Sequence, residues 1–372
     1  MAKTENEKRR SSLLFRFHID LPLLSGILTL MLLSLFMLYS AGGQNMDMVM
    51  RQAMKLGIGL GVMLVVAQIS PFTIQKWAPH IFIVGLSLLI AVLVMGDMGK
   101  GAQRWLDLGV IRFQPSEIMK LSLPMMMAWF LSQYTLPPNN KNTILSFIII
   151  GLPTLLIAKQ PDLGTSILVA SSGFFVLFIA GLRFRIIIGL LSASVPFLYI
   201  LWNYLMHGYQ KQRVLTFLNP ESDPLGAGYH IIQSKIAIGS GGMNGKGFLQ
   251  GTQSQLEFLP ERHTDFIFSV FSEEFGFIGV LLLLAIYAFI IVRGILIAIR
   301  AQEGFTKLLA ASLILTFFVY LFVNIGMVSG LLPVVGVPLP LVSWGGSSIV
   351  TLMASFGMLM AISTNKRLLA SN

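Results

Sequence analysis

The stretch from Phe266 to Val292 reads FIFSVFSEEFGFIGVLLLLAIYAFIIV, and its only charged residues are Glu273 and Glu274. A helix needs about 20 predominantly apolar residues to cross a hydrocarbon core of about 30 Å. The stretch is long enough for one crossing, and both carboxylates lie in its first third. It therefore predicts a transmembrane helix with two acidic residues near one end.

Nine further apolar runs with few or no charges recur along the chain. They lie near Leu21–Ser40, Leu56–Ile69, Ile81–Met95, Ile118–Leu131, Ile144–Ala158, Leu163–Leu182, Ile186–Leu205, Leu308–Met327 and Ser343–Ile362. The sequence therefore predicts an all-α, polytopic integral membrane protein with about ten transmembrane helices. We expect residues 1–372 to form one membrane domain, with a basic cytoplasmic tail over 1–19 and a large structured periplasmic loop over 206–264, between spans seven and eight.

The composition agrees with a membrane protein. Of the 372 residues, 55% are hydrophobic and 11% are charged, whereas soluble domains have about 25% charged residues. The net charge is +10, but the basic residues are scattered among apolar segments, and nucleic-acid binding requires a continuous basic face. We therefore expect no nucleic acid, and instead anionic lipid headgroups or phosphate-bearing substrates. The lack of cysteine excludes disulfides and thiolate nucleophiles.

Basic residues in short loops indicate the orientation, because such residues mark the cytoplasmic side. The chain ahead of the first run carries Lys3, Lys8, Arg9, Arg10 and Arg16. If it is cytoplasmic, the loops on the same side contain Lys76, Lys141, Arg183, Arg185, Arg300 and Lys307, and an even number of spans adds Lys366 and Arg367. We expect both termini to be cytoplasmic. The first run is too long for the core of a cleavable signal peptide, so we expect none.

The long loop between spans seven and eight is rich in glycine and also contains aromatic and aliphatic residues. Loops longer than about 12–15 residues without regular structure are usually functional or disordered. The aromatic and aliphatic side chains argue against disorder. The stretch Tyr229–Ile238 has helical spacing and could lie along the membrane interface.

Ionisable side chains within spans, or at their mouths, are costly in a membrane and are functional candidates for that reason. On the expected outer side these are Glu117, Lys120, Asp162, Asp265, Glu273 and Glu274. They gather on one side, whereas a pump or channel distributes such groups through the membrane depth. The pattern favours an enzyme that works at the outer surface.

Each of these residues also has a purely structural interpretation. Glu117 and Lys120 are three apart and share a helix face, so they either form an ion pair that fixes packing or line a polar cavity. Asp162 follows Pro161 at the start of a span and is a good helix N-cap, with a second role toward a cavity left open. One of the pair Glu273 and Glu274 is expected to face protein, and it is interpreted as structural unless a partner is present.

Asp265 ends the polar stretch Glu261-Arg262-His263-Thr264 and enters an apolar helix. It could cap that helix, but a cap does not require so many polar neighbours. A carboxylate at a water–membrane boundary can act as a general base, because partial desolvation raises its pKa.

Basic residues on the outer side form a second group. They are Lys100, Arg104, Arg112, Lys211, Arg213, Lys235 and Lys246. Such cations are either solvated near lipid headgroups or bind a diphosphate leaving group, whose developing negative charge arginine and lysine stabilise.

Two further patterns do not define sites, and a third stays open. The glycine-rich stretch from Gly239 to Gly247 lacks the spacing of a phosphate-binding loop. The histidines show no metal-ligand spacing, so we expect no structural metal. The small residues from Ser343 to Ser348 indicate either close helix packing or a locally broken helix that lines the cavity.

Several stretches together resemble the SEDS family (shape, elongation, division and sporulation). They are KGAQRWL (100–106), FQPSE (113–117), QPDLGT (160–165), PLGAGYH (224–230), PERHTDF (260–266), GLLP (330–333) and GGSS (345–348). The resemblance covers essentially the whole chain, and the run from Tyr229 to Phe268 is similar to the elongation branch, RodA, rather than to the division or sporulation branches.

The resemblance implies a peptidoglycan glycosyltransferase with ten spans in the bacterial inner membrane, which polymerises lipid II during lateral wall elongation and so maintains cell shape. It implies that the family's essential aspartate is Asp265, which deprotonates the 4-hydroxyl of the acceptor GlcNAc on the periplasmic side. That oxygen attacks the anomeric carbon of the donor MurNAc with inversion, and undecaprenyl diphosphate leaves. The substrate-binding or cavity-lining residues are expected to be Lys100, Arg104, Arg112, Glu117, Lys120, Asp162, Arg213, Lys246, Arg262, His263 and Ser347.

The resemblance also implies partners. Family members work with a class B penicillin-binding protein, which supplies transpeptidation, and with other membrane proteins of the elongation complex. No cofactor is required by the chemistry, and the sequence leaves open whether a divalent cation (Mg or Mn) shares the stabilisation of the diphosphate with Arg104.

Two other functions compete with the enzyme. A lipid II flippase suits ten spans and intramembrane charges, but the one-sided polar group and the large outer loop favour surface catalysis. A scaffold that only recruits a synthase does not require buried charges.

Overall fold

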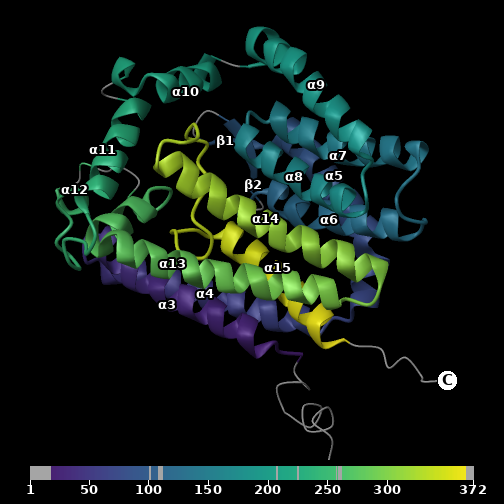
Figure 1. The fold of residues 1–372 in the computed structure, drawn as a ribbon, viewed down its shortest axis with the longest axis horizontal. Coiled ribbons are helices and arrows are strands. Elements are labelled where there is room, and N and C mark those ends of the chain that lie inside the picture. Colours follow the sequence, from purple (N-terminus) through teal and green to yellow (C-terminus); the bar gives the residue numbers. More distant parts are fainter. Residues whose placement is uncertain are drawn as a thin grey trace, which may run out of the picture.

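The computed structural model describes residues 18–99, 102–107, 112–206, 208–223, 226–256, 258 and 262–365. The helices of the first half, in the labels of Figure 1, are α3 (Leu21–Ala41), α4 (Met46–Ala67), α5 (Pro71–Met95), α6 (Pro115–Ser132), α7 (Asn140–Lys159), α8 (Leu163–Ile179) and α9 (Phe184–Ile200), which continues into a π-helical turn (Leu201–Leu205). Those of the second half are α10 (Gly208–Leu218), a 3₁₀ turn (Pro220–Ser222), α11 (Ala227–Ser240), α12 (Thr252–Gln255), α13 (Ile267–Arg300), α14 (Gly304–Val328) and α15 (Ser347–Thr364).

Each of the ten predicted apolar runs falls on a helix, which confirms the predicted fold class. Eight helices in the described part of the chain are long and apolar enough to cross a membrane. The other two predicted spans correspond to α6, which carries Glu117 and Lys120, and to α8, an apolar helix of 17 residues.

Several helix starts differ from the prediction, and the largest differences are ten residues, at α4 and at α5, which begins at Pro71 rather than Ile81. The helix α4 begins at Met46 rather than Leu56, because the Asn45 side chain caps it by accepting a hydrogen bond from the Met48 amide, 3.1 Å away. The last helix begins at Ser347 rather than Ser343. Hydrophobicity marks the part of a helix that lies in lipid, whereas caps and backbone hydrogen bonds determine where the helix begins.

A small antiparallel sheet, absent from the prediction, connects α5 to α6. It consists of β1 (Asp97–Gly99), β2 (Ala102–Asp107) and β3 (Arg112–Phe113), in the order β1-β2-β3. The central strand contacts both flanking helices. The sheet therefore carries Arg104 to the end of the bundle at which α6 begins.

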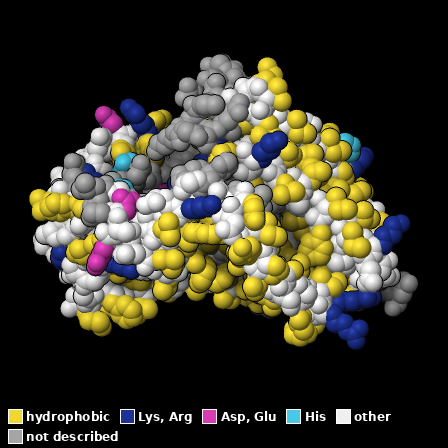
Figure 2. Space-filling view, turned by 90° about the horizontal axis from the view of Figure 1, so that it is seen from above, with side chains coloured by type: hydrophobic (Ala, Val, Ile, Leu, Met, Phe, Trp, Pro, Cys, Tyr) yellow, Lys and Arg dark blue, Asp and Glu magenta, His cyan; other side chains and the backbone are white. Residues whose placement is uncertain are grey.

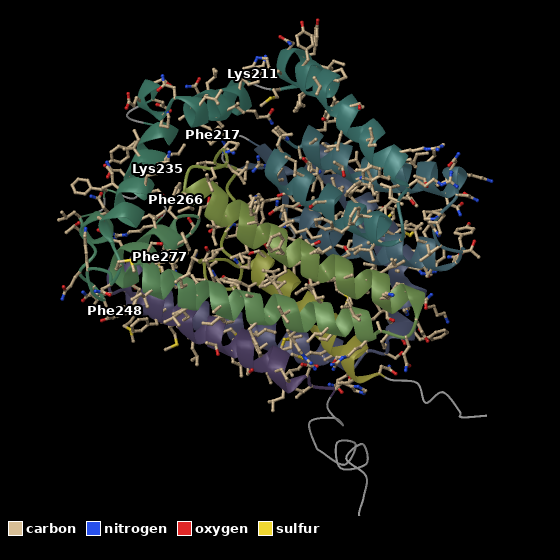
Figure 3. The ribbon with its side chains drawn as sticks, in the orientation of Figure 1. Lys211, Phe217, Lys235, Phe248, Phe266 and Phe277 are labelled. Carbon is tan, nitrogen blue, oxygen red and sulfur yellow. The ribbon has the colours of Figure 1, made fainter. Side chains whose placement is uncertain are left out.

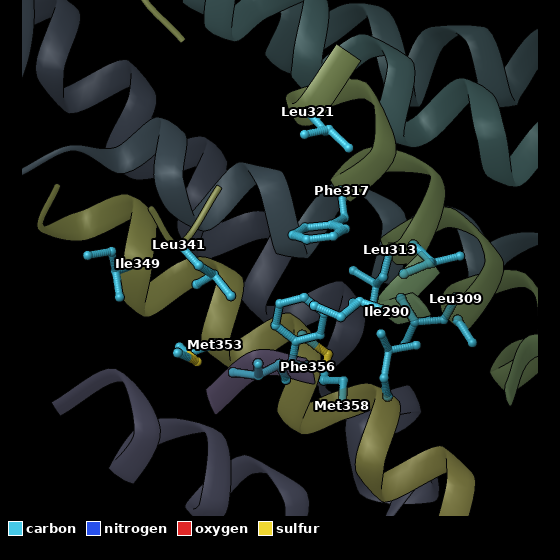
Figure 4. Packing of buried hydrophobic residues seen from close by; sticks show 14 of the residues in the cluster. Ile290, Leu309, Leu313, Phe317, Leu321, Leu341, Ile349, Met353, Phe356 and Met358 are labelled. Atoms are coloured by element: carbon cyan, nitrogen blue, oxygen red, sulfur yellow. The ribbon is translucent and has the colours of Figure 1, made fainter. Parts of the chain in front are cut away.

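The main hydrophobic core takes buried side chains from α3 to α8 and from α13 to α15, and Figure 4 shows the part where α13, α14 and α15 meet. The ring of Phe317 on α14 packs edge-on against Phe356 on α15 with centroids 5.1 Å apart, and tilted against Tyr287 on α13 at 5.9 Å. Glycines allow close helix contacts, since a Cβ at Gly294 would overlap Ile314 of α14. Such small residues are typical of helix interfaces in membranes, where packing replaces the hydrophobic effect.

Helices α3 and α13 run antiparallel, which defines the two ends of the bundle. At one end Arg293 pairs with Asp20, with 2.6 Å between Nη2 and Oδ2. At the other end the Ser40 hydroxyl donates to the Glu274 carboxylate. The end of α3, the start of α4 and the start of α13 therefore lie together, and the helices of the long loop, α10 to α12, are at this end in Figure 1.

The long loop attaches to the bundle through a break in α13. Gly276 has φ 63°, and there the segment 242–247 runs beside the helix. The amides of Phe277 and Ile278 donate to the carbonyls of residues 242 and 243, and those of residues 246 and 247 donate to the carbonyls of 273 and 274, at 2.9–3.1 Å. The break thus satisfies its own backbone groups through the loop, as a membrane helix requires. Phe248, labelled in Figure 3, then stacks on the Phe36 ring of α3, with centroids 4.0 Å apart.

Candidate functional site

The turn that precedes α13 is held by three consecutive carbonyl groups. The His263 carbonyl accepts from the Trp344 amide at 2.9 Å, and the Thr264 carbonyl accepts from the Ser343 hydroxyl at 2.6 Å. The Asp265 carbonyl accepts from Asn324 Nδ2 on α14 at 3.0 Å. Because each of these three carbonyls has a partner from α14 or from the connection between α14 and α15, the position of Asp265 is fixed by tertiary structure.

The connection that supplies these donors is itself fixed from three helices. The hydroxyl of Ser34 on α3 donates to the Val342 carbonyl at 2.8 Å, and Gln52 Nε2 on α4 donates to the Ser343 carbonyl at 3.2 Å. The Tyr287 hydroxyl on α13 donates to the Pro340 carbonyl at 2.6 Å. The segment 339–344 is therefore a rigid support for the turn of Asp265, although it is neither helix nor strand.

The Asp265 side chain is half-buried at the start of α13. The N-cap position belongs to Phe266, so Asp265 stands before the cap. A Cβ at Gly336 would lie 3.5 Å from its Oδ2, so the connection also passes beside the carboxylate. A glycine at 336 therefore lets the backbone of the connection pass close to this oxygen.

Asp162 has both of the roles considered from the sequence. Its Oδ1 caps α8 by accepting from the Thr165 amide at 3.2 Å, which confirms the predicted cap. Its Oδ2 accepts from Gln114 Nε2 at 3.3 Å and lies 3.8 Å from Arg104 Nε. Arg104 also donates to the carbonyls of Gln160 and Pro161. The guanidinium is thus anchored on the start of α8, while about a third of its side chain stays exposed.

The Arg104 group and Asp265 are linked by the α14–α15 connection. A Cβ at Gly164, two residues after Asp162, would lie 3.0 Å from the Val335 carbonyl. The next residue, Gly336, is the one beside Asp265. The segment 335–336 therefore lies between the start of α8 and the start of α13.

Glu117 and Lys120 form the predicted ion pair, with 2.7 Å between Oε1 and Nζ. Both side chains are buried, and within the described ranges Glu117 Oε2 has no hydrogen-bond partner. The Lys120 ammonium lies 5.4 Å from the ring centroid of Tyr320 on α14. The pair lines a narrow cavity that Ser348 and Thr351 of α15 also line. The pair therefore combines both interpretations, helix packing and cavity lining.

Glu273, interpreted as structural unless a partner is present, has one. Lys246 Nζ lies 2.7 Å from its Oε1, and the Thr252 hydroxyl and Gln253 amide donate to the same oxygen at 3.1 and 3.0 Å. Lys246, a predicted diphosphate ligand, is thus engaged in attaching the long loop to α13. Its ammonium is committed to a fully buried carboxylate.

The remaining predicted residues are more dispersed. Lys100 lies outside the described residues, and only the backbone of Arg112, in β3, is described. Arg213 is exposed on α10, and Arg262 Nη2 would lie 3.4 Å from a Cβ at Gly43. Ser347 is the first residue of α15.

Two of the other basic residues lie on the helices of the long loop. Figure 3 shows Lys211 on α10 and Lys235 on α11. The Lys235 side chain reaches the end of α14, since a Cβ at Gly330 would lie 2.7 Å from its Nζ.

Three neutral polar residues belong to the site, of which Asn324 and Gln52 were missed from the sequence and Ser343 was noted only as part of a small-residue stretch. Asn324 and Gln52 lie inside helices that cross the membrane, and Ser343 lies just before the last one. Intramembrane polar residues are functional candidates on the same grounds as charges, so this signal was present in Asn324 and Gln52. Among the described residues, no three or more His, Asp or Glu side chains are grouped as a metal would require.

Fold and site together define a polytopic helical membrane protein whose buried polar groups meet at one end of the bundle, beneath a structured loop. The chain belongs to the cell cycle protein family of FtsW, RodA and SpoVE, whose family model matches residues 12–368.

Relatives agree with the branch expected from the sequence. The chain is 56% identical over 360 residues to the peptidoglycan glycosyltransferase MrdB of Escherichia coli (strain K12), with 96% of both chains covered. It is 35% identical over 361 residues to the stage V sporulation protein E of Bacillus subtilis (strain 168), with 93% and 97% covered. The identity to MrdB is thus much higher than the identity to the sporulation protein. This difference, together with the similarity to a solved RodA structure described next, confirms the predicted resemblance to the elongation branch.

Solved structures share the fold. A chain from a structure described as the structural coordination of polymerization and crosslinking by a peptidoglycan synthase complex has a TM-score of 0.81 and 30% identity, covering 92% of this chain and 97% of that one. The rod shape determining protein RodA of Thermus thermophilus has a TM-score of 0.70 and 27% identity, covering 92% and 96%.

Proposed function

We propose that this chain is a peptidoglycan glycosyltransferase that polymerises lipid II into β-1,4-linked glycan strands during lateral elongation of the cell wall. The 56% identity to MrdB over 96% of both chains supports the enzyme class. The observation that carries the assignment to a site is the turn of Asp265, in which three successive carbonyls are held from distant parts of the chain.

In the proposed reaction Asp265 is the general base. Its carboxylate takes the proton of the acceptor GlcNAc 4-hydroxyl as that oxygen bonds to the anomeric carbon of the donor MurNAc. The bond from that carbon to the diphosphate breaks, and undecaprenyl diphosphate leaves with the electron pair. A single displacement converts the α-linked donor into a β-1,4 bond, so no covalent enzyme intermediate forms. General-base catalysis requires such a carboxylate at a fixed position, which the held turn provides.

The leaving diphosphate is assigned to Arg104 and neighbouring cations. An arginine fork stabilises charge that develops on phosphate oxygens. Arg104 is suited to this because its Nε and Nη2 are anchored on backbone carbonyls while part of the side chain stays exposed. Asp162, the carboxylate beside it, already accepts from Thr165 and Gln114. A Mg or Mn ion would have to share that carboxylate, and the proposed steps do not use one.

The Glu117–Lys120 pair is assigned to the wall of the substrate cavity. Lys120 contacts Tyr320, and the same cavity is lined by α15 from Ser348 onward. A buried charge pair costs more than an apolar pair of similar volume, so its presence favours a role in orienting polar groups of the substrate.

We place the active site on the periplasmic side of the inner membrane, with both termini in the cytoplasm. Figure 2 supports this orientation: the acidic side chains visible on this face lie toward the end of α11 and α12, among some Lys and Arg, whereas the opposite end shows Lys and Arg without visible acidic side chains. Basic residues mark the cytoplasmic side. The proposed partners are a class B penicillin-binding protein and other membrane proteins of the elongation complex, and the solved synthase complex that shares this fold supports the first.

The proposal is tested by polymerisation of fluorescent lipid II with purified protein and its transpeptidase-inactivated class B partner. We expect long glycan strands from the wild type and none from Asp265→Asn, with Asp47→Asn, an exposed aspartate on α4, as the matched control. Translocation of lipid II in vesicles without any polymer would establish the flippase instead. Normal polymerisation by Asp265→Asn would refute the assignment of the base but not the enzyme class.

A further inference from the structure

Two cations on α4 remain outside the assigned chemistry. Arg51 and Lys55 are one turn apart on a helix long and apolar enough to cross the membrane, and their like charges repel each other. Arg51 is exposed and Lys55 half-buried. Within the described ranges neither forms an ion pair with a carboxylate, although Asp47 is four residues before Arg51.

The pair lies beside the turn of Asp265. The Lys55 ammonium is 3.7 Å from the ring centroid of Trp344, and the Trp344 amide is one of the donors that hold the turn, through the His263 carbonyl. One turn of α4 also supplies Gln52, which donates to the Ser343 carbonyl. Lys55 therefore stands against the same rigid connection that supports the proposed base.

This connection has a cationic group at each end. Its residue Val335 lies against the start of α8, where Arg104 is anchored, and its residue Trp344 lies under Lys55. Asp265 is between them, beside Gly336 and held through Ser343. The order along the connection is thus the Arg104 group, the carboxylate, and the Arg51–Lys55 pair.

Two like charges one helical turn apart destabilise the helix unless an anion accompanies them, and no carboxylate of the described residues forms an ion pair with either. The anions available at a membrane surface are phosphate groups, either of lipid headgroups or of lipid-linked substrates. Arginine and lysine together suit a diphosphate, because the guanidinium forms bidentate hydrogen bonds and the ammonium acts as a point charge. Joining two lipid-linked molecules requires room for two diphosphates, and only one of them leaves.

We propose that Arg51 and Lys55 form a second diphosphate-binding subsite, which holds the polyprenyl diphosphate of the acceptor substrate while Arg104 receives that of the donor. This inference rests on the proposed function. The two cationic groups place the two lipid-linked substrates on opposite sides of Asp265, so that the acceptor hydroxyl and the donor anomeric carbon meet at the base.

The test measures binding rather than turnover, so that it is independent of catalysis. The inactive Asp265→Asn protein in phosphatidylcholine nanodiscs is titrated with fluorescent lipid II. We expect this parent to bind two molecules of lipid II per protein. When Arg51→Gln/Lys55→Gln is added, one of the two should no longer bind, or its affinity should fall by about tenfold or more. A fall of that size is expected when charge-assisted hydrogen bonds are removed. Arg51→Lys/Lys55→Arg retains both molecules. Lys76→Gln, an exposed cation at the opposite end of the bundle, is the matched control.

An unchanged stoichiometry and affinity in the double variant would overturn the proposal. The proposal is also overturned if both proteins bind two molecules of lipid II and phosphatidylglycerol stabilises the parent but not the double variant. Arg51 and Lys55 would then form a site for a lipid headgroup. Thermal unfolding checks that each variant is folded. If the double variant is not folded, the titration is repeated with the single variant Arg51→Gln, which changes an exposed position. Failure of the proposed function has a different signature: two molecules bind as described, but the wild type makes no polymer.

Discussion

The Ser343 hydroxyl donates a hydrogen bond of 2.6 Å to the carbonyl of Thr264, although the two residues are 79 positions apart in the sequence. The same hydroxyl accepts from the Leu339 amide at 2.8 Å. One small side chain thus closes the irregular segment 339–343 on itself and joins it to the residue before Asp265. The rigidity of the proposed base therefore depends on a segment that has no regular secondary structure.

Ser343→Ala should reduce polymerisation as well as stability. Loss of the hydroxyl leaves the Thr264 carbonyl and the Leu339 amide without their partner, at a cost of about 1–3 kcal/mol. A small displacement of the turn misplaces the carboxylate, so we expect kcat to fall by about 10- to 100-fold with little change in KM. Steady-state rates of lipid II polymerisation measure both.

The matched control for that variant is Ser194→Ala on the exposed helix α9, where the hydroxyl donates only to the Leu191 carbonyl of its own helix. It should leave both constants unchanged. A Ser343→Ala protein with wild-type kcat would show that the turn keeps its position without this hydrogen bond.

The Glu117–Lys120 pair allows structure and function to be separated. Lys120→Met leaves a buried carboxylate unpaired and should cost about 3–5 kcal/mol, whereas Glu117→Gln/Lys120→Met removes both charges and should recover most of that stability. If the pair also orients the substrate, as proposed, polymerisation stays low in the double variant. Thermal unfolding and polymerisation, measured on the same preparations, distinguish the two effects.

A double variant that recovered activity together with stability would assign the pair to packing alone. Ser146→Ala is a useful control for the measurement, because it alters a fully buried polar side chain of α7 that does not line the cavity.

Much of the fold follows from the sequence because it depends on local properties. Hydrophobic length determines which segments can cross a membrane, and all ten predicted runs fall on helices. The cap at Asp162 was also predictable, since it depends on an aspartate three residues before the amide that it accepts. The start of α4 was not, because Arg51 and Lys55 interrupt the apolar pattern without interrupting the helix.

The site was predictable only in part, because its contacts are long-range. Charge identified Asp265 and Asp162 as candidates, but nothing near Ser343 in the sequence indicates that it holds Thr264. Lys246 shows the same limit: its charge suggested a phosphate ligand, and only the structure shows Glu273, 27 positions away, beside it. The sequence indicates which polar and charged groups are costly to bury, whereas the fold determines which of them form hydrogen bonds or ion pairs with one another.

Gly245→Ala should detach the long loop from α13. Gly245 has φ +79°, and an added Cβ would collide with the Glu274 carbonyl. Because alanine at positive φ is strained and the contact is with backbone, we expect a cost of about 1 kcal/mol or more and faster amide exchange over residues 241–256. Gly239→Ala is the matched control, since a Cβ there meets nothing within 4 Å. Unaltered exchange in Gly245→Ala would mean that the helix break tolerates a side chain.

Asp20 should make the stability of the protein sensitive to acid. Burial raises the pKa of its carboxyl. Hydrogen bonds from Arg293, Ser363 and the Leu23 amide together lower the pKa by more than burial raises it, so the pKa lies below the ordinary value. A carboxyl with a lowered folded-state pKa contributes stability above its unfolded pKa, about 3.9, and loses that contribution as the pH falls through the folded-state value.

The measurement is thermal unfolding from pH 7 to pH 2.5 for the wild type and Asp20→Asn. At neutral pH the wild type should be more stable by about 1–3 kcal/mol, the contribution of hydrogen bonds to a charged group. That advantage should stay constant down to about pH 4 and then shrink, because the protonated wild-type carboxyl resembles the amide of the variant. For Asp47→Asn, an exposed position in the first turn of α4, the advantage of the wild type should not exceed about 0.3–1 kcal/mol at any pH. An advantage of the wild type over Asp20→Asn that persisted through the acid range would show that the Asp20 contacts stabilise the protein through packing rather than through charge.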